Sequence, residues 1–168
     1  MIEEHPPLVS ILDFSLIANH YHLYLFANIE NSVPIFIQKL NRGFSGYFNL
    51  KYGRKGHLFE GPYKSVATET ENQGVAISRY VSVINPLDLY QPNWRKDGLR
   101  DWQKALSFLK SFSFSSFPDK IGERRSSILA TQSILRQYSF MGCSEKEVRE
   151  FTERFLKEKD QSVKYFYE

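Results

Sequence analysis

The hydrophobic and polar positions of the chain follow two different periods, which predicts both strands and helices. Apolar residues are nearly continuous from Leu8 to Ile17, as in a buried strand, and this run leads into a second strand that contains two histidines. Beyond Asn31 and Ser32, either of which can cap a helix, apolar side chains recur at near-helical spacing. This pattern predicts a helix that ends between residues 49 and 52.

The next part of the chain combines a bent strand with three further helices. Residues 57–68 have alternating apolar positions around a Gly-Pro pair, which is compatible with a bulged strand returning beside the histidine strand. A capping box at Thr70 and Gln73 opens a helix whose apolar stripe runs to Asn85 and Pro86, where we expect the helix to stop. Two more helices are expected, at residues 101–110 and after the capping box formed by Ser144 and Glu147.

Length and composition agree with a small enzyme or DNA-binding domain. The 168 residues suit one domain with a moderate core, and no stretch of 18 apolar residues occurs. A single cysteine, Cys143, excludes an intramolecular disulfide and a Cys-rich zinc site. The first ten residues resemble no signal peptide, so we expect a cytoplasmic protein with no membrane partner.

Positive charge is concentrated in one part of the chain, although the net charge is only +3. Six cationic side chains and one carboxylate lie between Gln38 and Val66, with aromatic residues interleaved. Cations follow a phosphate backbone and aromatic faces stack on unpaired bases, so this composition predicts a groove for single-stranded DNA. Phe44, Phe48 and Phe59 are expected in the core instead. The residues predicted to bind DNA are Lys39, Arg42, Tyr47, Arg54, Lys55, His57, Tyr63 and Lys64.

Two histidines flank a bulky residue in the sequence His20-Tyr21-His22. Side chains at positions i and i+2 of a strand point to the same face, so both imidazoles are expected on one side. Two neutral imidazoles can hold a divalent ion, and such an ion can polarise a phosphate oxygen. An isolated pair of this kind is more often an ordinary surface or half-buried pair, so the motif needs support from the rest of the chain.

From Val9 to Pro118 the sequence resembles the REP-associated tyrosine transposases, which belong to the HUH single-tyrosine transposase superfamily. Several blocks carry the resemblance and occur in the expected order. They are Asn19–Leu23, Gln38–Asn49, Tyr52–Ser65, Ser78–Pro86 and the turn Phe114–Phe117. The resemblance implies an α+β fold, an antiparallel sheet with helices packed on it as in the HUH (ferredoxin-like) transposases. We expect this domain at residues 1–118, followed by a helical C-terminal extension at residues 119–168.

The resemblance also implies a metal-dependent endonuclease and strand transferase that acts on single-stranded or hairpin DNA. His20 and His22 would hold Mg²⁺ or Mn²⁺, and Tyr80 matches the tyrosine that the family uses as nucleophile. Attack by Tyr80 would leave a 5′-phosphotyrosine and a free 3′-hydroxyl, with no nucleotide cofactor. Without the resemblance, the position of Tyr80 on an apolar stripe predicts a core tyrosine whose hydroxyl reaches a polar partner.

The sequence departs from the family pattern at the position of the third metal ligand. Relatives commonly have an asparagine or glutamine four residues after the tyrosine, whereas this chain has Ile84 there and Asn85 one position later. In a regular α-helix, position i+4 lies about 40° around the helix from Tyr80 and position i+5 about 140°. Asn85 is therefore a candidate metal ligand only if the helix is loosened, for instance by a π-bulge.

A second departure is the missing strand and helix with which relatives usually begin. Their absence would leave a sheet edge with bare N–H and C=O groups. The chain is then either a truncated family member or covered by a second chain, for which a homodimer is attractive. Two function classes follow: an active DNA nuclease, or an inactive or truncated DNA-binding module of the same family.

Overall fold

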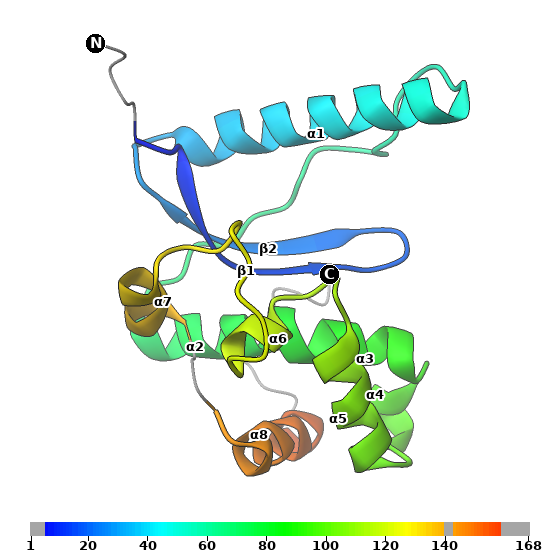
Figure 1. Ribbon diagram of the computed structural model, residues 1–168, viewed down its shortest axis with the longest axis vertical. Helices are drawn as coiled ribbons and strands as arrows, with labels where there is room; N and C mark the ends of the chain where they lie inside the picture. Colours follow the sequence, from blue (N-terminus) through cyan, green and yellow to red (C-terminus); the bar gives the residue numbers. More distant parts are fainter. Residues whose placement is uncertain (1–5, 140–142, 159–168) are drawn as a thin grey trace. The chain divides into compact units, whose positions relative to one another are not determined.

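The computed structural model describes residues 6–139 and 143–158, which form a two-stranded antiparallel sheet and a series of helices (Figure 1). The α+β class predicted from the sequence is confirmed at this level. The elements are β1 (Val9–Leu16), β2 (Tyr21–Ala27), α1 (Ser32–Tyr52), α2 (Glu71–Arg79), the π-helix η1 (Tyr80–Ile84), α3 (Asn85–Tyr90), α4 (Trp94–Asp97), α5 (Trp102–Ser111), α6 (Phe117–Lys120), α7 (Gln132–Tyr138) and α8 (Glu145–Glu158).

The described residues group into two compact units. Unit 1 comprises residues 6–10 and 25–67, and unit 2 comprises residues 11–24, 68–139 and 143–158. Most of the buried hydrophobic side chains belong to unit 2; within the described part of unit 1, Val9 and Ile37 are buried. The predicted boundary between residues 118 and 119 falls inside α6.

Unit 1 is built around the long helix α1, which begins and ends as the sequence predicted. Asn31 occupies the N-cap position, but its backbone is left-handed (φ 57°) and its side chain makes no cap bond, so the expected side-chain cap is wrong. At the other end, Gly53 adopts φ 62° and donates its N–H to the Asn49 carbonyl. None of the helices within the described ranges, including the 21-residue α1, is both long and apolar enough to cross a membrane.

The segment that follows α1 forms no strand within the described residues, so the strand expected at residues 57–68 is wrong. Gly56 adopts a positive φ, and Pro62 has no backbone N–H to donate to a ladder. The Asn49 side-chain amide donates to the Gly56 carbonyl (2.9 Å), which holds the start of the returning segment against α1. This segment therefore packs through side chains rather than through sheet pairing.

In unit 2 the outer edge of β1 is partly covered by the chain itself. The residues of the predicted Phe114–Phe117 turn pair with β1, and Ser15 and Ser115 form an antiparallel bridge. Three backbone bonds make this cover: Leu16 N–H to Phe114 O (2.8 Å), Ser116 N–H to Phe14 O (2.9 Å) and Ala130 N–H to Ile11 O (2.8 Å). The expectation of a wholly bare edge is wrong, because distant segments satisfy part of it.

The helix that carries Tyr80 continues beyond the proline at which it was expected to stop. Thr70 caps α2 through a bond from the Gln73 N–H, as predicted. The chain then widens into η1, where the Asn85 N–H donates to the Tyr80 carbonyl, and resumes as α3 (Figure 1). Pro86 would clash with the preceding turn of a regular α-helix, and the wider π-turn accommodates it.

A fully buried polar network ties β1 to three other parts of unit 2. The Asp13 carboxylate lies 3.1 Å from the Lys120 Nζ of α6, and neither side chain is exposed to solvent. Three serine hydroxyls donate to the same carboxylate: Ser78 from α2 (2.6 Å), Ser116 before α6 (2.8 Å) and Ser139 after α7 (3.0 Å). These bonds fix α2, and therefore Tyr80, relative to the strand that leads into the histidines.

Candidate functional site

The two histidines of the motif lie next to each other at the start of β2. His20 precedes the strand and is exposed, whereas His22 lies within the strand and is half-buried. Their ring centroids are 5.0 Å apart with the planes at 74°. The His20 Nδ1 lies 2.7 Å from the Asn19 Oδ1, which restrains the orientation of that ring.

Tyr80 contacts the histidine pair although it lies far along the chain. The Tyr80 and His22 ring centroids are 6.0 Å apart, with the planes nearly perpendicular. Tyr80 is the first residue of η1 and is only 2% exposed, and its ring also packs against Phe155 of α8 (6.2 Å). The structure thus brings the predicted nucleophile beside the predicted metal ligands, within unit 2, and buries it as the hydrophobic stripe predicted.

A guanidinium group completes the surroundings of the Tyr80 hydroxyl. The Arg95 Nη2 donates to the Tyr80 Oη at 3.5 Å, and the guanidinium carbon lies 5.4 Å from the Tyr80 ring centroid. Asp88 holds Arg95 through two bonds, from Nε (2.9 Å) and from Nη2 (2.6 Å), and also accepts the Trp94 indole N–H (2.9 Å). The polar partner of Tyr80 is therefore a cation that a carboxylate orients.

Burial governs the protonation of this group of residues. Desolvation, with smaller contributions from His20 and Arg95, lowers the pKa of His22 to about 4, so this imidazole is neutral at pH 7 and keeps its lone pair for a ligand. Burial raises the pKa of Tyr80, and the neighbouring Arg95 opposes this change only in part. Asp88 raises the pKa of Arg95, which stays charged. Tyr80 is therefore a neutral phenol in this arrangement.

The π-turn changes the position of Asn85 relative to Tyr80. Because the Asn85 N–H bonds to the Tyr80 carbonyl, residue i+5 lies one turn above Tyr80, where residue i+4 would lie in an α-helix. The Asn85 side chain is buried (1% exposed), and its Nδ2 makes no hydrogen bond. A half-turn of the amide exchanges its nitrogen and oxygen, so this position can present an acceptor. The widened turn that Asn85 needs in order to be a candidate metal ligand is therefore present.

A metal site here would have to use a mixed set of ligands. Within residues 6–139 and 143–158, no three His, Cys, Asp or Glu side chains gather as a metal cluster. The candidate donors are the adjacent imidazoles of His20 and His22 and the amide of Asn85, one turn above Tyr80, whose buried Nδ2 makes no hydrogen bond. Imidazole and amide ligands fit Mn²⁺ better than Mg²⁺, which prefers oxygen ligands and retains water.

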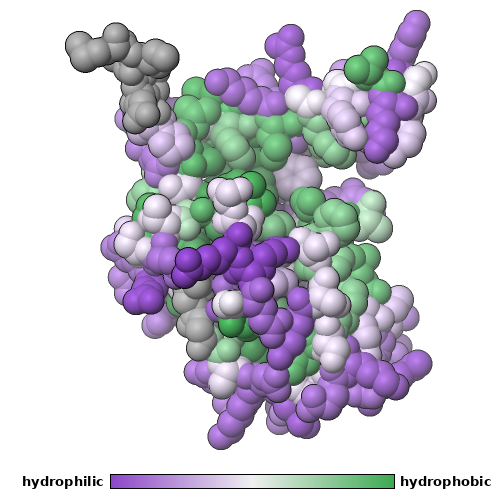
Figure 2. All heavy atoms as spheres, in the orientation of Figure 1, coloured by the Kyte–Doolittle hydropathy of each residue, from purple (hydrophilic) through white to green (hydrophobic). Residues whose placement is uncertain are grey.

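The residues predicted to bind DNA all lie in unit 1 and are all exposed. Lys39, Arg42 and Tyr47 come from α1, and the other five come from the segment that follows it. Figure 2 shows hydrophilic and hydrophobic residues side by side at the C-terminal end of α1. Two cations lie over aromatic rings there: Lys51 over Tyr47 and Tyr52 (5.5 and 5.4 Å), and Arg54 over Phe48 (5.6 Å).

The aromatic residues expected in the core of this region are not fully buried. Phe44 is 48% exposed, while Phe48 and Phe59 are half-buried. Their rings form a row along α1, with centroids 6.0 Å apart between Phe44 and Phe48 and 6.3 Å apart between Phe44 and Phe59. The expectation that these three side chains lie in the core is therefore wrong for Phe44 and only partly met by Phe48 and Phe59.

Sequence reasoning missed Arg95 and Asp88. They lie on two different short helices, so the periodicity that relates side chains within one helix does not relate them.

Comparison of the chain with protein-family models, curated proteins and solved structures found no match. Membership of the REP-associated tyrosine transposases therefore stays a prediction.

Proposed function

We propose that the protein is a metal-dependent single-stranded DNA endonuclease and strand transferase of the transposase type, acting on hairpin-containing DNA. The observation that carries the proposal is the contact between the Tyr80 and His22 rings, 6.0 Å apart. The two residues lie 58 positions apart in the sequence, and the resemblance implies that the tyrosine and the histidines act on the same phosphate. A homodimer remains a further expectation of the resemblance.

The proposed reaction uses the Tyr80 hydroxyl as nucleophile. Its Oη forms a bond to the scissile phosphorus while the bond from phosphorus to the 3′-oxygen breaks. The phenol proton leaves to solvent and the 3′-oxygen takes up a proton, so the products are a 5′-phosphotyrosine and a 3′-hydroxyl. Reversal by the same or another 3′-hydroxyl rejoins DNA without a nucleotide cofactor.

His20, His22 and Asn85 are the residues that would hold the metal ion. His22 is neutral at pH 7, and the buried Nδ2 of the Asn85 amide makes no hydrogen bond. Bound Mn²⁺ or Mg²⁺ would supply positive charge against a phosphate oxygen. Burial raises the pKa of Tyr80 above its ordinary value near 10 and so disfavours the phenolate. The proposed reaction therefore depends on the positioning of the phenol against a phosphate activated by the metal ion and Arg95.

Arg95 has a role in the proposed reaction that follows from its distance to the attacking atom. Its Nη2 lies 3.5 Å from the Tyr80 Oη, so a phosphate attached to that oxygen is within reach of the guanidinium. Fixed cations aimed at the position where charge develops stabilise a transition state more than the ground state. Asp88 orients Arg95 for this contact through its two bonds.

The burial of Tyr80 favours a second candidate function. A side chain that is 2% exposed has to be uncovered before a phosphate reaches its hydroxyl. If it is never uncovered, the protein is a DNA-binding module of the same family that has lost turnover. The exposed cations of unit 1 support DNA binding in either case.

Trapping of a covalent adduct separates the two candidates. A labelled single-stranded hairpin library is incubated with the protein and Mn²⁺ or Mg²⁺, and protein–DNA adducts are resolved on a denaturing gel. Wild-type protein should form an adduct, and Tyr80→Phe, which retains nearly all of the packing, should form none while binding DNA as before. Tyr90→Phe is the matched control and should retain the adduct. Absence of any adduct from wild-type protein with either metal would establish the binding module instead.

A further inference from the structure

A hollow in unit 1 is bounded by α1 on one side and by residues 56–61 on the other. Its volume is about 590 Å³, which lies within the range of small-molecule sites. Asn41, Arg42 and Ser45 contribute from the helix, and His57, Phe59 and Glu60 from the returning segment. All of these residues belong to unit 1, so the hollow lies within one compact unit.

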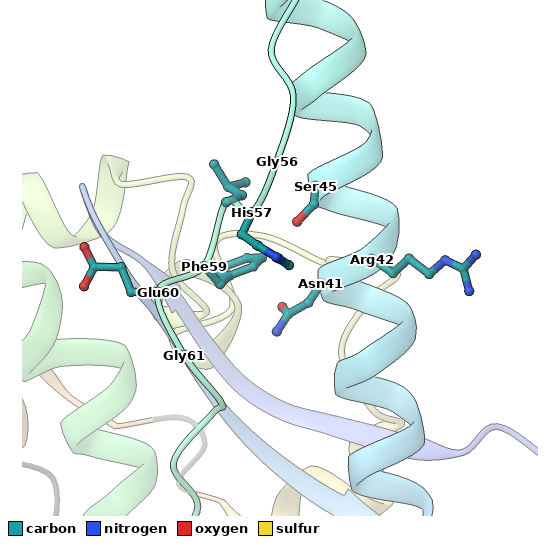
Figure 3. Close-up of a pocket in the computed structure, with 9 residues that line it drawn as sticks. Asn41, Arg42, Ser45, Gly56, His57, Phe59, Glu60 and Gly61 are labelled. Carbon is teal, nitrogen blue, oxygen red and sulfur yellow. The ribbon is translucent and has the colours of Figure 1, made fainter.

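The side chains around the hollow point in two directions, either into it or away from it. In Figure 3, Asn41, Ser45, His57 and Phe59 are turned toward the space between the helix and the returning segment. Arg42 points away from it on the far side of the helix, and Glu60 points away on the opposite side. The groups turned into the hollow are therefore an amide, a hydroxyl, an imidazole and one aromatic ring, and Leu58 adds an apolar part of the lining.

The walls of the hollow are held in place before any ligand binds. Gly53 and Gly56 adopt φ values of 62° and 94°, which turn the chain back after α1. The Asn49 amide bonds the Gly56 carbonyl at 2.9 Å, and the Phe59 ring packs 6.3 Å from the Phe44 ring. Preorganised walls reduce the entropy that binding would otherwise cost.

The chemistry of the lining selects a class of ligand. An anionic ligand would be met by cations directed inward, but Arg42 is directed outward. A purely apolar ligand would leave the amide of Asn41 and the hydroxyl of Ser45 unmatched. A flat, neutral heterocycle with donors and acceptors along its edge matches both the aromatic face and these polar groups, while its attached phosphate would lie toward the exposed cations.

We propose that this hollow binds one unpaired nucleobase of the single-stranded DNA. Phe59 supplies the stacking face, and Asn41 and Ser45 contact the edge of the base and so distinguish among bases. The inference rests on the DNA partner of the proposed function but not on its chemistry. It assigns sequence preference to unit 1, apart from the residues around Tyr80.

Binding of short oligonucleotides in EDTA tests the proposal without cleavage. The probes are 12-mers of dA, dC and dT, each with a central 2-aminopurine whose fluorescence reports stacking. Phe59→Leu should weaken binding by about 5- to 150-fold, as expected for one lost base stack. Asn41→Ala should make the affinities for the three sequences more alike. Phe114→Leu makes the same substitution at a 57% exposed phenylalanine of unit 2 that does not line the hollow, and should leave both the affinity and the fluorescence change as in wild type.

Two further binding measurements complete the test, one with an abasic oligonucleotide and one with a free nucleoside. Replacing the central base by an abasic site should weaken wild-type binding as much as Phe59→Leu does, and combining the two changes should weaken it no further. Equal effects of Phe59→Leu and Phe114→Leu, or no effect of the abasic site, would overturn the pocket while leaving the proposed nuclease intact. Titration with 2-aminopurine riboside alone covers the remaining case. Phe59-dependent binding of the nucleoside without binding of DNA would overturn the assignment of the hollow to DNA and would count against the nuclease. Binding of neither probe overturns the pocket.

Discussion

The cations of unit 1 that are predicted to bind DNA and two ion pairs of unit 2 lie in different environments. In unit 1 the predicted DNA-binding cations, such as Arg42 and Lys55, are exposed. In unit 2 the pair Asp13 and Lys120 is fully buried, and the Arg95–Asp88 pair is about one-third exposed. Exposed charges remain available to an external polyanion, whereas buried charges are committed to partners within the fold.

This difference separates binding from chemistry in the proposed function. Changes in the exposed region should alter DNA affinity with little effect on stability, because surface substitutions seldom change it by more than about 0.5 kcal/mol. Changes in the buried region should alter the fold, the reaction, or both. Each of the following substitutions tests one side of this contrast.

The largest change in stability is expected from Lys120→Met. Lys120 Nζ pairs with Asp13 at 3.1 Å and donates to the Leu12 carbonyl at 2.8 Å. Burial raises the pKa of Asp13 and lowers that of Lys120, since each charge is disfavoured away from water, and their attraction opposes both shifts. Removal of the lysine leaves an uncompensated buried carboxylate, so the free energy of unfolding in urea should fall by about 3–5 kcal/mol.

The double variant Asp13→Asn/Lys120→Met is the matched control for this loss. It removes both charges and leaves a neutral amide among the serine hydroxyls of the network. Much of the lost stability should return. A single variant that is within about 1 kcal/mol of wild type would show that the pair is neutral or hydrated, and the contrast between the units would be weaker.

Several helices and helix ends could be predicted from the sequence, but the buried polar network could not. Local signals predicted α1 with its stop at Gly53, and the cap of Thr70, because these depend on neighbouring residues. The pairing of Ser116 with Asp13 depends on residues 103 positions apart, for which the sequence carries no spacing signal. The π-turn was only partly predictable: the sequence made a loosened helix the condition for Asn85 to be a ligand, and the structure shows that loosening at η1.

A smaller effect on stability and a large effect on reaction are expected from Arg95→Gln. The Arg95 and Asp88 side chains are 28% and 36% exposed, so losing their ion pair and the ring stacking should lower stability by no more than about 2 kcal/mol. The single-turnover rate of adduct formation should fall by about 10²–10³-fold, as when one transition-state donor is removed. Arg79→Gln is the control, because Arg79 lies over the Phe151 ring at 5.2 Å and should affect only stability. Equal rates in both variants would remove Arg95 from the reaction.

Asn85→Ala tests whether the π-turn has a function in metal binding. The Asn85 amide lies one turn above Tyr80, and its buried Nδ2 makes no hydrogen bond. Removal of this amide should weaken Mn²⁺ binding, measured by calorimetry, by about 10- to 100-fold. Ser82→Ala is the control, because Ser82 lies on the same turn and its hydroxyl bonds the Ser78 carbonyl at 2.7 Å. If both variants weaken Mn²⁺ binding equally, the turn matters for packing and Asn85 is not a ligand.

The smallest change is expected in unit 1, from the double variant Arg54→Gln/Lys55→Gln. Both side chains are exposed, and Arg54 also lies over the Phe48 ring at 5.6 Å, so stability should fall by less than about 1 kcal/mol. If each cation contacts one phosphate, the slope of log affinity against log salt concentration should flatten by about 0.7 per contact. Lys146→Gln/Arg149→Gln removes two cations of α8 in unit 2, 85% and 57% exposed, and should leave the slope unchanged. Equal slopes for the two double variants would mean that positive charge acts on DNA without regard to position, and the DNA-binding surface assigned to unit 1 would have to be abandoned.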